Sequence, residues 1–394
     1  MDEDTKGSGS PPSVDYGDGE EDEPLAAEGP SSAAASHEVP ADAETEVPET
    51  AMRPRRVESA LKDAKTFEDY RKKRPFKFLH MYSGPNDPLG QAIKLEAAKN
   101  RLNVVVLSLD NQLDPDLDLA DPGGFQIMKE DVSKGEWDYT HAGFPCGSFS
   151  MARHNVTPGQ PGPVRDKLNI YGLPGNSPQQ QAEADKGTRM ATQASEIYEA
   201  QVNSCIKRKV PPLATLENPP GSEESGSAWD VPEVSACLQR TKAIRANYNT
   251  CAYQLKSKER HFKPGVWTGR LQNLEKVSKV CRCPAWIKHT ALVGKRKTAP
   301  AAEYPAALAE TIAAEVVMVW KKTLNLEWWR YQFETKSKVV NDLQRHGLRT
   351  KRRKPEEGRP GLSLRRGLHR WPSRSTTSKA MIWPRARKRG QPRS

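Results

Sequence analysis

Long hydrophobic segments are missing from this sequence, and their absence limits where the protein can work. Only 36% of its 394 residues are hydrophobic. The longest apolar segment, near Ile312 to Trp320, is interrupted by Glu315 and falls far short of the roughly 20 residues that a membrane-spanning helix needs. The acidic start, Met1-Asp2-Glu3-Asp4, is unlike the basic beginning of a secretory signal peptide. We therefore expect a soluble, intracellular protein with no membrane partner.

Cysteine is scarce as well, with six residues, all in the middle of the chain. In an intracellular protein these thiols are expected to stay reduced. The sequence has no Cys-x-x-Cys pair of the kind that thiol oxidoreductases use. An unrelated thiol enzyme or reductase is therefore the least favoured of the functions that we considered.

Charge is divided unevenly between the two ends of the chain. Residues 1–50 carry 15 acidic side chains and one lysine, whereas residues 341–394 carry 17 basic and three acidic side chains. Such composition is typical of segments that do not fold alone. We predict an acidic disordered arm over residues 1–55 and a basic, mostly disordered tail over residues 334–394. The tail favours nucleic acid as a partner, and its basic clusters at 351–354 and 385–389 would suit nuclear import, although a merely solubilising tail is the alternative.

The segment between these arms has the pattern of an α/β domain. Residues 56–74 suit a short surface helix or linker, and the folded domain is expected over residues 75–333. It opens with an apolar strand at Phe76–Tyr82, a helical pattern at Leu89–Lys99, and a β-branched run at Val104–Asp110 that suits a strand covered on both faces. A strand, helix and strand in this order form a βαβ unit. We therefore predict a Rossmann-like, doubly wound and mostly parallel sheet.

The remaining pattern continues this alternation. Further elements are expected as helices over 179–209, 231–245 and 301–324, and as strands over 212–216 and 249–255. The Gly- and Pro-rich stretch 158–178 is long for a connection and is expected to act as a functional loop or lid. Four basic residues on or near it would either hold phosphate groups or form ordinary solvated surface: Arg153, Arg165, Lys167 and Arg189.

Several polar side chains follow the predicted strands. Cys146 lies on a short loop after a strand-like lead-in at Trp137–Thr140, with Gly143 allowing a turn and Pro145 stiffening the backbone. Asp110 and Glu217 each close a strand, and Asp131 follows a glycine-rich turn. Because ligands of open α/β sheets bind at the carboxyl ends of the strands, we expect these residues and Gly84 to line one crevice.

Two of these segments, in this order, resemble motifs of a known family. Phe144-Pro145-Cys146-Gly147-Ser148-Phe149-Ser150 looks like the Pro-Cys loop, and Leu216-Glu217-Asn218-Pro219 like the Glu-Asn motif, of the S-adenosylmethionine-dependent cytosine-C5 DNA methyltransferases. The resemblance covers roughly residues 76–325 and indicates a divergent branch. His80 and Asn86 replace an aspartate and a glycine of the family pattern, and the usual long target-recognition region is nearly absent.

The resemblance implies a set of site residues. Cys146 would be the nucleophile that adds to C6 of a flipped-out cytosine, and Glu217 would act near N3 with a raised pKa. Arg260 is the nearest match to a third catalytic position. S-adenosyl-L-methionine would be held by residues at the strand ends: Tyr82, Ser83, Gly84, Asp110, Asp131, Val132 and Pro145. Residues 302–313, with Tyr304-Pro305, would form the closing helix.

The predicted activity is therefore methyl transfer to C5 of cytosine in DNA. An RNA cytosine-C5 methyltransferase on the same fold is one alternative. A nucleic-acid-binding protein on a decayed methyltransferase scaffold is the other, since the cofactor turn is altered and the recognition region is missing.

A second group of metal-binding residue types lies near the end of the domain. Cys281, Cys283 and His289 are close in sequence, and Cys251 or His261 would be a further ligand of a zinc ion. Cys-x-Cys is tighter than the usual zinc spacing and no second close pair exists. We therefore favour half-buried thiols without metal, and keep structural zinc as the alternative.

Overall fold

A computed structural model of the chain describes residues 54–114, 119, 121–154, 162–254, 260–284, 286–289 and 303–350. Nearly all of the predicted acidic arm and all of the chain after residue 350, with both basic clusters, lie outside these residues, so disorder and nuclear import stay predictions. Within the described part, no helix combines the length and the apolar character that crossing a membrane would require.

Six strands form one mostly parallel sheet in the order β2-β1-β3-β4-β6-β5. Their bounds are β1 Phe76–Met81, β2 Val104–Leu109, β3 Tyr139–Ala142, β4 Ala214–Asn218, β5 Ile244–Asn249 and β6 Pro264–Arg270. The first four pair in parallel, and β6 runs antiparallel between β4 and β5. The predicted Rossmann-like, doubly wound α/β fold is thus confirmed.

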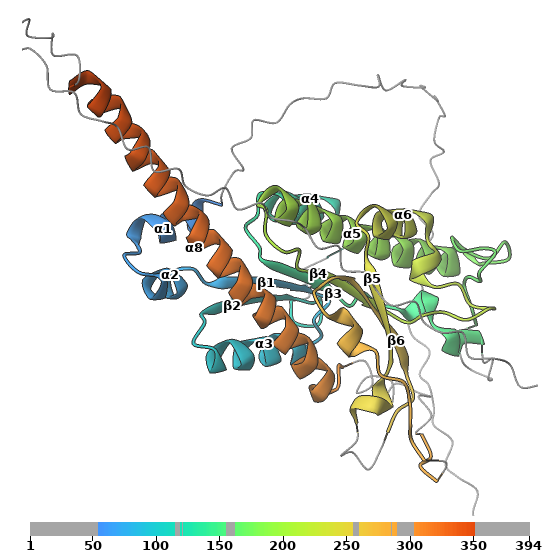
Figure 1. Ribbon diagram of the computed structural model, residues 1–394. Coiled ribbons are helices and arrows are strands. Elements are labelled where there is room, and N and C mark those ends of the chain that lie inside the picture. Colours follow the sequence, from blue (N-terminus) through green and yellow to red (C-terminus); the bar gives the residue numbers. More distant parts are fainter. Residues whose placement is uncertain are drawn as a thin grey trace, which may run out of the picture. The chain divides into compact units, whose positions relative to one another are not determined.

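Helices cover both faces of this sheet (Figure 1). One face carries α4 (Pro122–Ser133), α5 (Pro178–Lys207) and α6 (Pro232–Arg240), and the other carries α3 (Pro88–Lys99) and α8 (Ala306–Thr350). The alternation of side chains along β1 explains the two layers, because successive residues of a strand point to opposite faces. Phe76 and Phe78 belong to the core beneath α3 and α8, whereas Leu79 and Met81 belong to the core beneath α5.

The strand β2 differs from its prediction. It pairs with β1 alone and is an edge strand of the sheet. Val105 and Leu107 are 48% and 41% exposed, so one face of the strand is open. A nearly continuous β-branched run is typical of covered strands, but β-branched residues also suit a strand with one open face, and only the helix layers that pack over the strand separate the two cases.

The segment predicted as a surface helix or linker forms two helices that join the core. In α1 (Arg55–Asp63) Val57 and Leu61 are buried, and in α2 (Phe67–Lys73) Tyr70 is buried. The guanidinium of Arg74, just after α2, bonds both oxygens of buried Asp138. These contacts attach residues 55–74 to the sheet.

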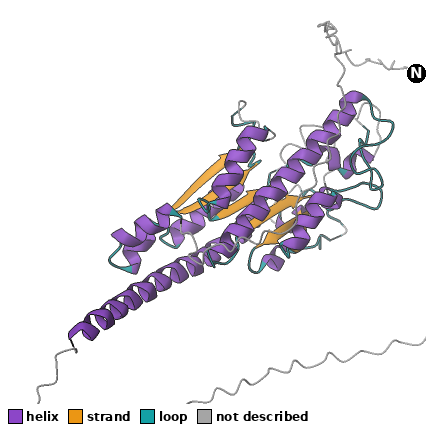
Figure 2. Cartoon of the chain, turned by 90° about the horizontal axis from the view of Figure 1, so that it is seen from above, coloured by secondary structure: helices purple, strands orange, loops and turns teal. Residues whose placement is uncertain are grey.

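In the C-terminal half of the domain, the observed strands and helices differ from the predicted ones. The strand expected over residues 249–255 is wrong. The strand in this region is β5, which ends at Asn249, and Thr250–Tyr253 forms a 3-10 helix, η4. Strand β6 was not predicted. Helix α8 begins close to its expected start but continues to Thr350, through the first part of the predicted tail. Figures 1 and 2 show it as one long helix whose second half extends past the sheet.

Candidate active site at the carboxyl ends of β1, β3 and β4

The Pro-Cys loop follows β3 and is anchored on both sides of its sulfur. Phe144 and Phe149 are buried, whereas Pro145 and Gly147 are exposed and Cys146 is half-buried. Residues 147–149 form a 3-10 turn, η1 (Gly147–Phe149), in which the N–H of Phe149 donates to the carbonyl of Cys146 over 2.9 Å. The apolar side chains therefore fix the loop while the thiol between them stays accessible.

Arg165 packs against this loop and has neither of the two roles considered for it, a phosphate contact or a solvated surface charge. Its guanidinium lies 4.0 Å from the ring centroid of Phe149 and donates to the carbonyl of Ile170 over 2.7 Å. It is 1% exposed, so it cannot bind phosphate. The described part of the expected lid, residues 162–178, is tied to α5 through this side chain. Lys167 and Arg189 are exposed, as a phosphate contact requires.

Arg153, the fourth basic candidate, is ion-paired with Glu183 on α5. This pairing connects the segment after η1 to the same helix and occupies the guanidinium.

Glu217, at the end of β4, is held in a nearly dry environment. It is 7% exposed. The hydroxyl of Tyr248 donates to its Oε1 over 2.9 Å, and the hydroxyl of Tyr304 donates to its Oε2 over 3.4 Å. Burial raises the pKa of Glu217, and the charge of Lys263 and the two tyrosine hydrogen bonds offset part of that increase. The raised pKa expected from the sequence is confirmed.

Asn218 joins the two predicted motifs. Its side-chain amide donates to the carbonyl of Phe144 over 2.8 Å, so the end of β4 holds the Pro-Cys loop directly. A Cβ atom placed on Gly143 would lie 3.8 Å from Oε2 of Glu217 and would collide with the hydroxyl of Tyr304. A side chain at this position would therefore displace the hydroxyl of Tyr304, and the acid lies beside the loop that carries Cys146.

A chain of buried polar groups extends from Glu217 through β3. The hydroxyl of Tyr304 lies 3.0 Å from Nε2 of His141, and Nδ1 of His141 lies 2.8 Å from the hydroxyl of Thr215, which also contacts the hydroxyl of Tyr139 at 2.6 Å. Burial lowers the pKa of His141, so its imidazole is neutral. The network is satisfied if Nε2 carries the proton and donates to Tyr304, an assignment inferred from its partners.

Sequence reasoning gave no role to His141 or Tyr248, and treated Tyr304 only as part of the closing segment. The sequence held one usable signal for Tyr248, the alternation of Ala246 and Tyr248 with polar Arg245 and Asn247. For His141 and Tyr304, which are 163 residues apart, no local signal exists.

The turn after β1 brings two predicted cofactor residues together. Gly84 has a φ of +69° and donates its N–H to Oδ2 of Asp110 over 2.9 Å, while Gln112 donates its N–H to Oδ1 over 2.8 Å. Tyr82 also has a positive φ, and Ser83 is buried beside it. This turn lies where the sheet order reverses, at β1, which is the expected ligand position of a doubly wound sheet.

Asp131 and Val132 do not lie at a strand end. They belong to the last part of α4, and Val132 is completely buried in the core. The Pro122-Gly123-Gly124 segment starts that helix instead of forming a turn, because Asp121 caps its N-terminus by accepting from the N–H of Gly124. The predicted placement of this pair beside the cofactor at the strand ends is therefore corrected.

His80 and Asn86, the two residues near the cofactor turn that differ from the family pattern, each contact another side chain. His80 is buried, and its Nδ1 lies 2.7 Å from Oδ1 of Asp87, the residue that caps α3. Asn86 bonds the carboxylate of Glu303, just before α8. The turn is thus connected to the segment that carries Tyr304.

Arg260, the predicted third catalytic residue, contacts the cysteine cluster. Its guanidinium is 3.4 Å from the sulfur of Cys283, so it belongs with the cysteine cluster. The cation whose charge acts on Glu217 is Lys263, three residues later. Within the described residues, Cys251, Cys281, Cys283 and His289 also converge, and His261 is not part of that group.

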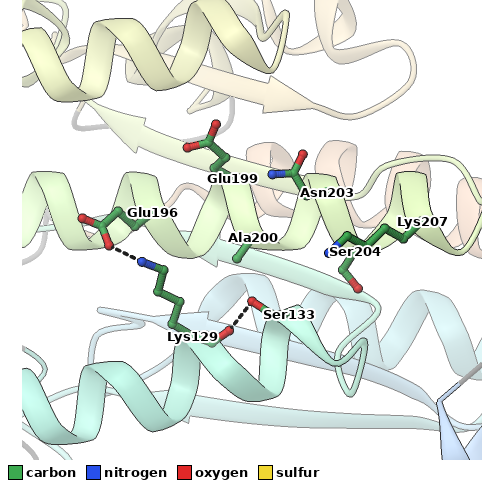
Figure 3. A pocket seen from close by; sticks show the side chains of 8 residues that line it. All are labelled: Lys129, Ser133, Glu196, Glu199, Ala200, Asn203, Ser204 and Lys207. Atoms are coloured by element: carbon green, nitrogen blue, oxygen red, sulfur yellow. Dashed lines mark hydrogen bonds and ion pairs between the residues drawn. The ribbon is translucent and has the colours of Figure 1, made fainter. Parts of the chain in front are cut away.

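A surface hollow of about 240 Å³ lies elsewhere, between α4 and α5 (Figure 3). An ion pair of 2.7 Å between Lys129 and Glu196 crosses it. Its lining includes none of the residues predicted from the sequence, and its centre lies between helices instead of at the strand ends. We therefore do not assign the function to this hollow.

Comparison with known proteins gives only weak similarities. No family model and no curated protein matches the chain. Solved structures that are similar include a triple mutant of DNMT2 from Spodoptera frugiperda, with a TM-score of 0.28, 12% identity and coverage of 56% of this chain and 60% of that chain. The Dnmt2 methyltransferase of S. pombe has a TM-score of 0.21, 12% identity and coverage of 55% and 58%. This chain spans less than two-thirds of the length of either.

Proposed function

We propose that this protein transfers a methyl group from S-adenosyl-L-methionine to C5 of cytosine in nucleic acid, with DNA as the expected substrate. The observation that carries the proposal is the hydrogen bond of 2.8 Å from Asn218 to the carbonyl of Phe144. It couples the strand end that bears Glu217 to the loop that bears Cys146, as a thiol and an acid acting on one base require.

Cys146 has the exposure that a nucleophile needs. As a thiolate it would add to C6 of the cytosine ring, and the displaced electron pair would make C5 nucleophilic. After C5 is methylated, loss of the C5 proton and cleavage of the bond between sulfur and C6 would restore the aromatic ring and the free thiolate. Phe144 and Phe149, buried on either side, hold the sulfur in place during both bond changes.

Glu217 is buried, and burial favours the protonated form of its carboxyl group. Its raised pKa would let the carboxyl group hold a proton near N3 of the base while negative charge develops on the ring. The hydroxyl of Tyr304 contacts Glu217 and lies close to Gly143, so it would line the space next to the acid.

The turn after β1 fits the nucleoside part of the cofactor. S-adenosylmethionine would supply an electrophilic methyl group. Each oxygen of Asp110 accepts one N–H and keeps further lone-pair capacity for a ribose hydroxyl. No described atom lies within 4 Å of a Cβ built on Gly84, so the backbone there is open to a ligand. Tyr82 and Ser83 complete this turn, and Pro145 lies exposed on the neighbouring loop.

The nucleic acid would be held through phosphate contacts, for which Lys167 and Arg189 are exposed and available. A base in a duplex must leave the stack to reach Cys146. These features suit DNA and RNA equally, and the test therefore includes both.

The deciding experiment measures transfer of labelled methyl groups to cytosine-containing DNA and RNA of matched sequence. A second arm uses 5-fluorocytosine, whose C5 cannot lose a proton, so that a covalent protein–nucleic acid adduct accumulates. We expect transfer and an adduct with the wild-type chain, and neither with Cys146→Ala. Transfer that persists in Cys146→Ala would overturn the assignment.

A nucleic-acid-binding protein on a decayed scaffold is the second candidate, and one observation favours it. Both oxygens of Glu217 are engaged by tyrosine hydroxyls, so the acid is covered. This candidate predicts salt-dependent nucleic-acid binding and no heat of binding with S-adenosylhomocysteine, whereas the proposed enzyme predicts cofactor binding in the same calorimetric titration.

A further inference from the structure

Three cysteines and one histidine from two distant segments meet at the end of β5. Cys251 lies in η4, directly after that strand, and Cys281, Cys283 and His289 follow the 3-10 helix η5 (Leu274–Val277). The four potential ligand atoms all lie within 4.8 Å of one another. We propose that these residues bind one structural zinc ion as a Cys₃His site.

The spacing of the ligand atoms suits tetrahedral zinc. With zinc–sulfur bonds of about 2.3 Å, the sulfurs of a tetrahedral site lie about 3.8 Å apart. The sulfur of Cys281 and Nε2 of His289 are already 3.5 Å apart, so small side-chain movements complete the geometry. All six cysteines of the chain are free thiols, so no disulfide competes for these sulfurs. Binding would deprotonate three thiols and keep the imidazole neutral.

Neighbouring residues contact two of the proposed zinc ligands, as the orientation of metal ligands requires. The N–H of Cys281 donates to the side-chain carbonyl of Asn249 over 2.8 Å, which orients the first sulfur of the Cys-x-Cys segment. Arg260 lies 3.4 Å from the sulfur of Cys283. Three thiolates with one Zn²⁺ leave a net charge of −1, which the guanidinium of Arg260 balances.

The proposed ion would brace the candidate active site. Cys251 follows Tyr248 by three residues, and Tyr248 donates to Glu217. The ion would tie this end of β5 to residues 281–289, adding to the backbone hydrogen bond of 2.9 Å from Asn249 to Lys279. Four protein ligands leave no open coordination position, so the ion is structural and takes no part in the chemistry.

Metal content tests the proposal without reference to activity. The full chain, purified without chelator, is analysed for zinc by mass spectrometry, and we expect close to one zinc per chain. Cys283→Ser should lose most of it. Cys146→Ser is the matched control, because Cys146 is also half-buried but lies outside the cluster, and it should keep full zinc content.

Cobalt substitution covers the case in which a cluster variant fails to fold. The wild-type chain, depleted of zinc and loaded with Co²⁺, should show the intense visible bands of tetrahedral cobalt and the thiolate charge-transfer band, and zinc should abolish both. A wild-type chain that contains no zinc and gives only the pale spectrum of octahedral cobalt refutes the site. Neither readout depends on methyl transfer. The zinc proposal and the proposed function can therefore each fail without affecting the other.

Discussion

Removing the hydroxyl of Tyr304 is the sharpest test of the buried network. In Tyr304→Phe, His141 keeps a buried Nε2–H whose partner at 3.0 Å is gone, and Glu217 loses its donor at 3.4 Å. A buried donor without a partner costs about 1–3 kcal/mol, and the weak second bond adds little. We therefore expect the free energy of unfolding to fall by about 1–3 kcal/mol, with no change in the denaturant slope.

The assay is urea unfolding followed by tryptophan fluorescence, in which stability changes move the midpoint while the slope reports the surface exposed on unfolding. Tyr171→Phe is the matched control, because the Tyr171 hydroxyl bonds Glu233 over 3.0 Å at an exposed position. That variant should lie within about 0.5 kcal/mol of the wild type. Equal stability of the two variants would refute the network, including the proton placement on His141.

Three further predictions concern the same rim of the sheet. Cys146→Ser should abolish methyl transfer and the 5-fluorocytosine adduct while cofactor binding persists in calorimetry; an adduct that survives would exclude this nucleophile. Asn218→Ala should lower the free energy of unfolding by about 1–3 kcal/mol, because the carbonyl of Phe144 loses its buried donor, and a midpoint identical to that of the wild type would contradict the coupling. The pKa of Glu217 is raised above its ordinary 4.5 in the folded state. The carboxyl group therefore stabilises the fold while it is protonated, and this stabilisation is lost as the pH rises from about 4.5 through the folded-state pKa. Glu217→Gln should remove this part of the pH dependence in thermal unfolding measured between pH 4 and 8, and an unchanged profile would show that the carboxyl is not in a dry site.

The fold was predictable because its first half obeys local rules. The apolar run at β1 and the helical period at α3 each depend on residues that are neighbours in sequence, and they were placed correctly. For β6, the short segment Pro264–Arg270 contains two glycines and no alternating pattern, and its strand conformation depends on pairing with both β4 and β5.

The candidate site was predictable where motif and strand end coincide. Gly84 and Asp110 meet, and Glu217 lies beside the Pro-Cys loop, because parallel strands bring their carboxyl ends to one edge. The prediction for Asp131 was wrong because Asp121 and Pro122 start helix α4, and Asp131 lies near the end of that helix instead of at that edge. Arg165 is neither a phosphate contact nor a solvated surface charge, because it is buried against Phe149 and supports the loop, which no local pattern records.

The sequence by itself determined the alternation of strands and helices, the two motifs and the order in which they follow one another, since these depend on periodicity and on residue type. The tertiary structure alone decided that β2 is an edge and that Tyr248 and Tyr304 cover Glu217. It also decided that Cys251, and not His261, joins Cys281, Cys283 and His289. The physical reason is distance along the chain. Contacts between groups separated by tens to hundreds of residues arise from how the layers close on each other, and neither propensity nor spacing within one segment contains that information.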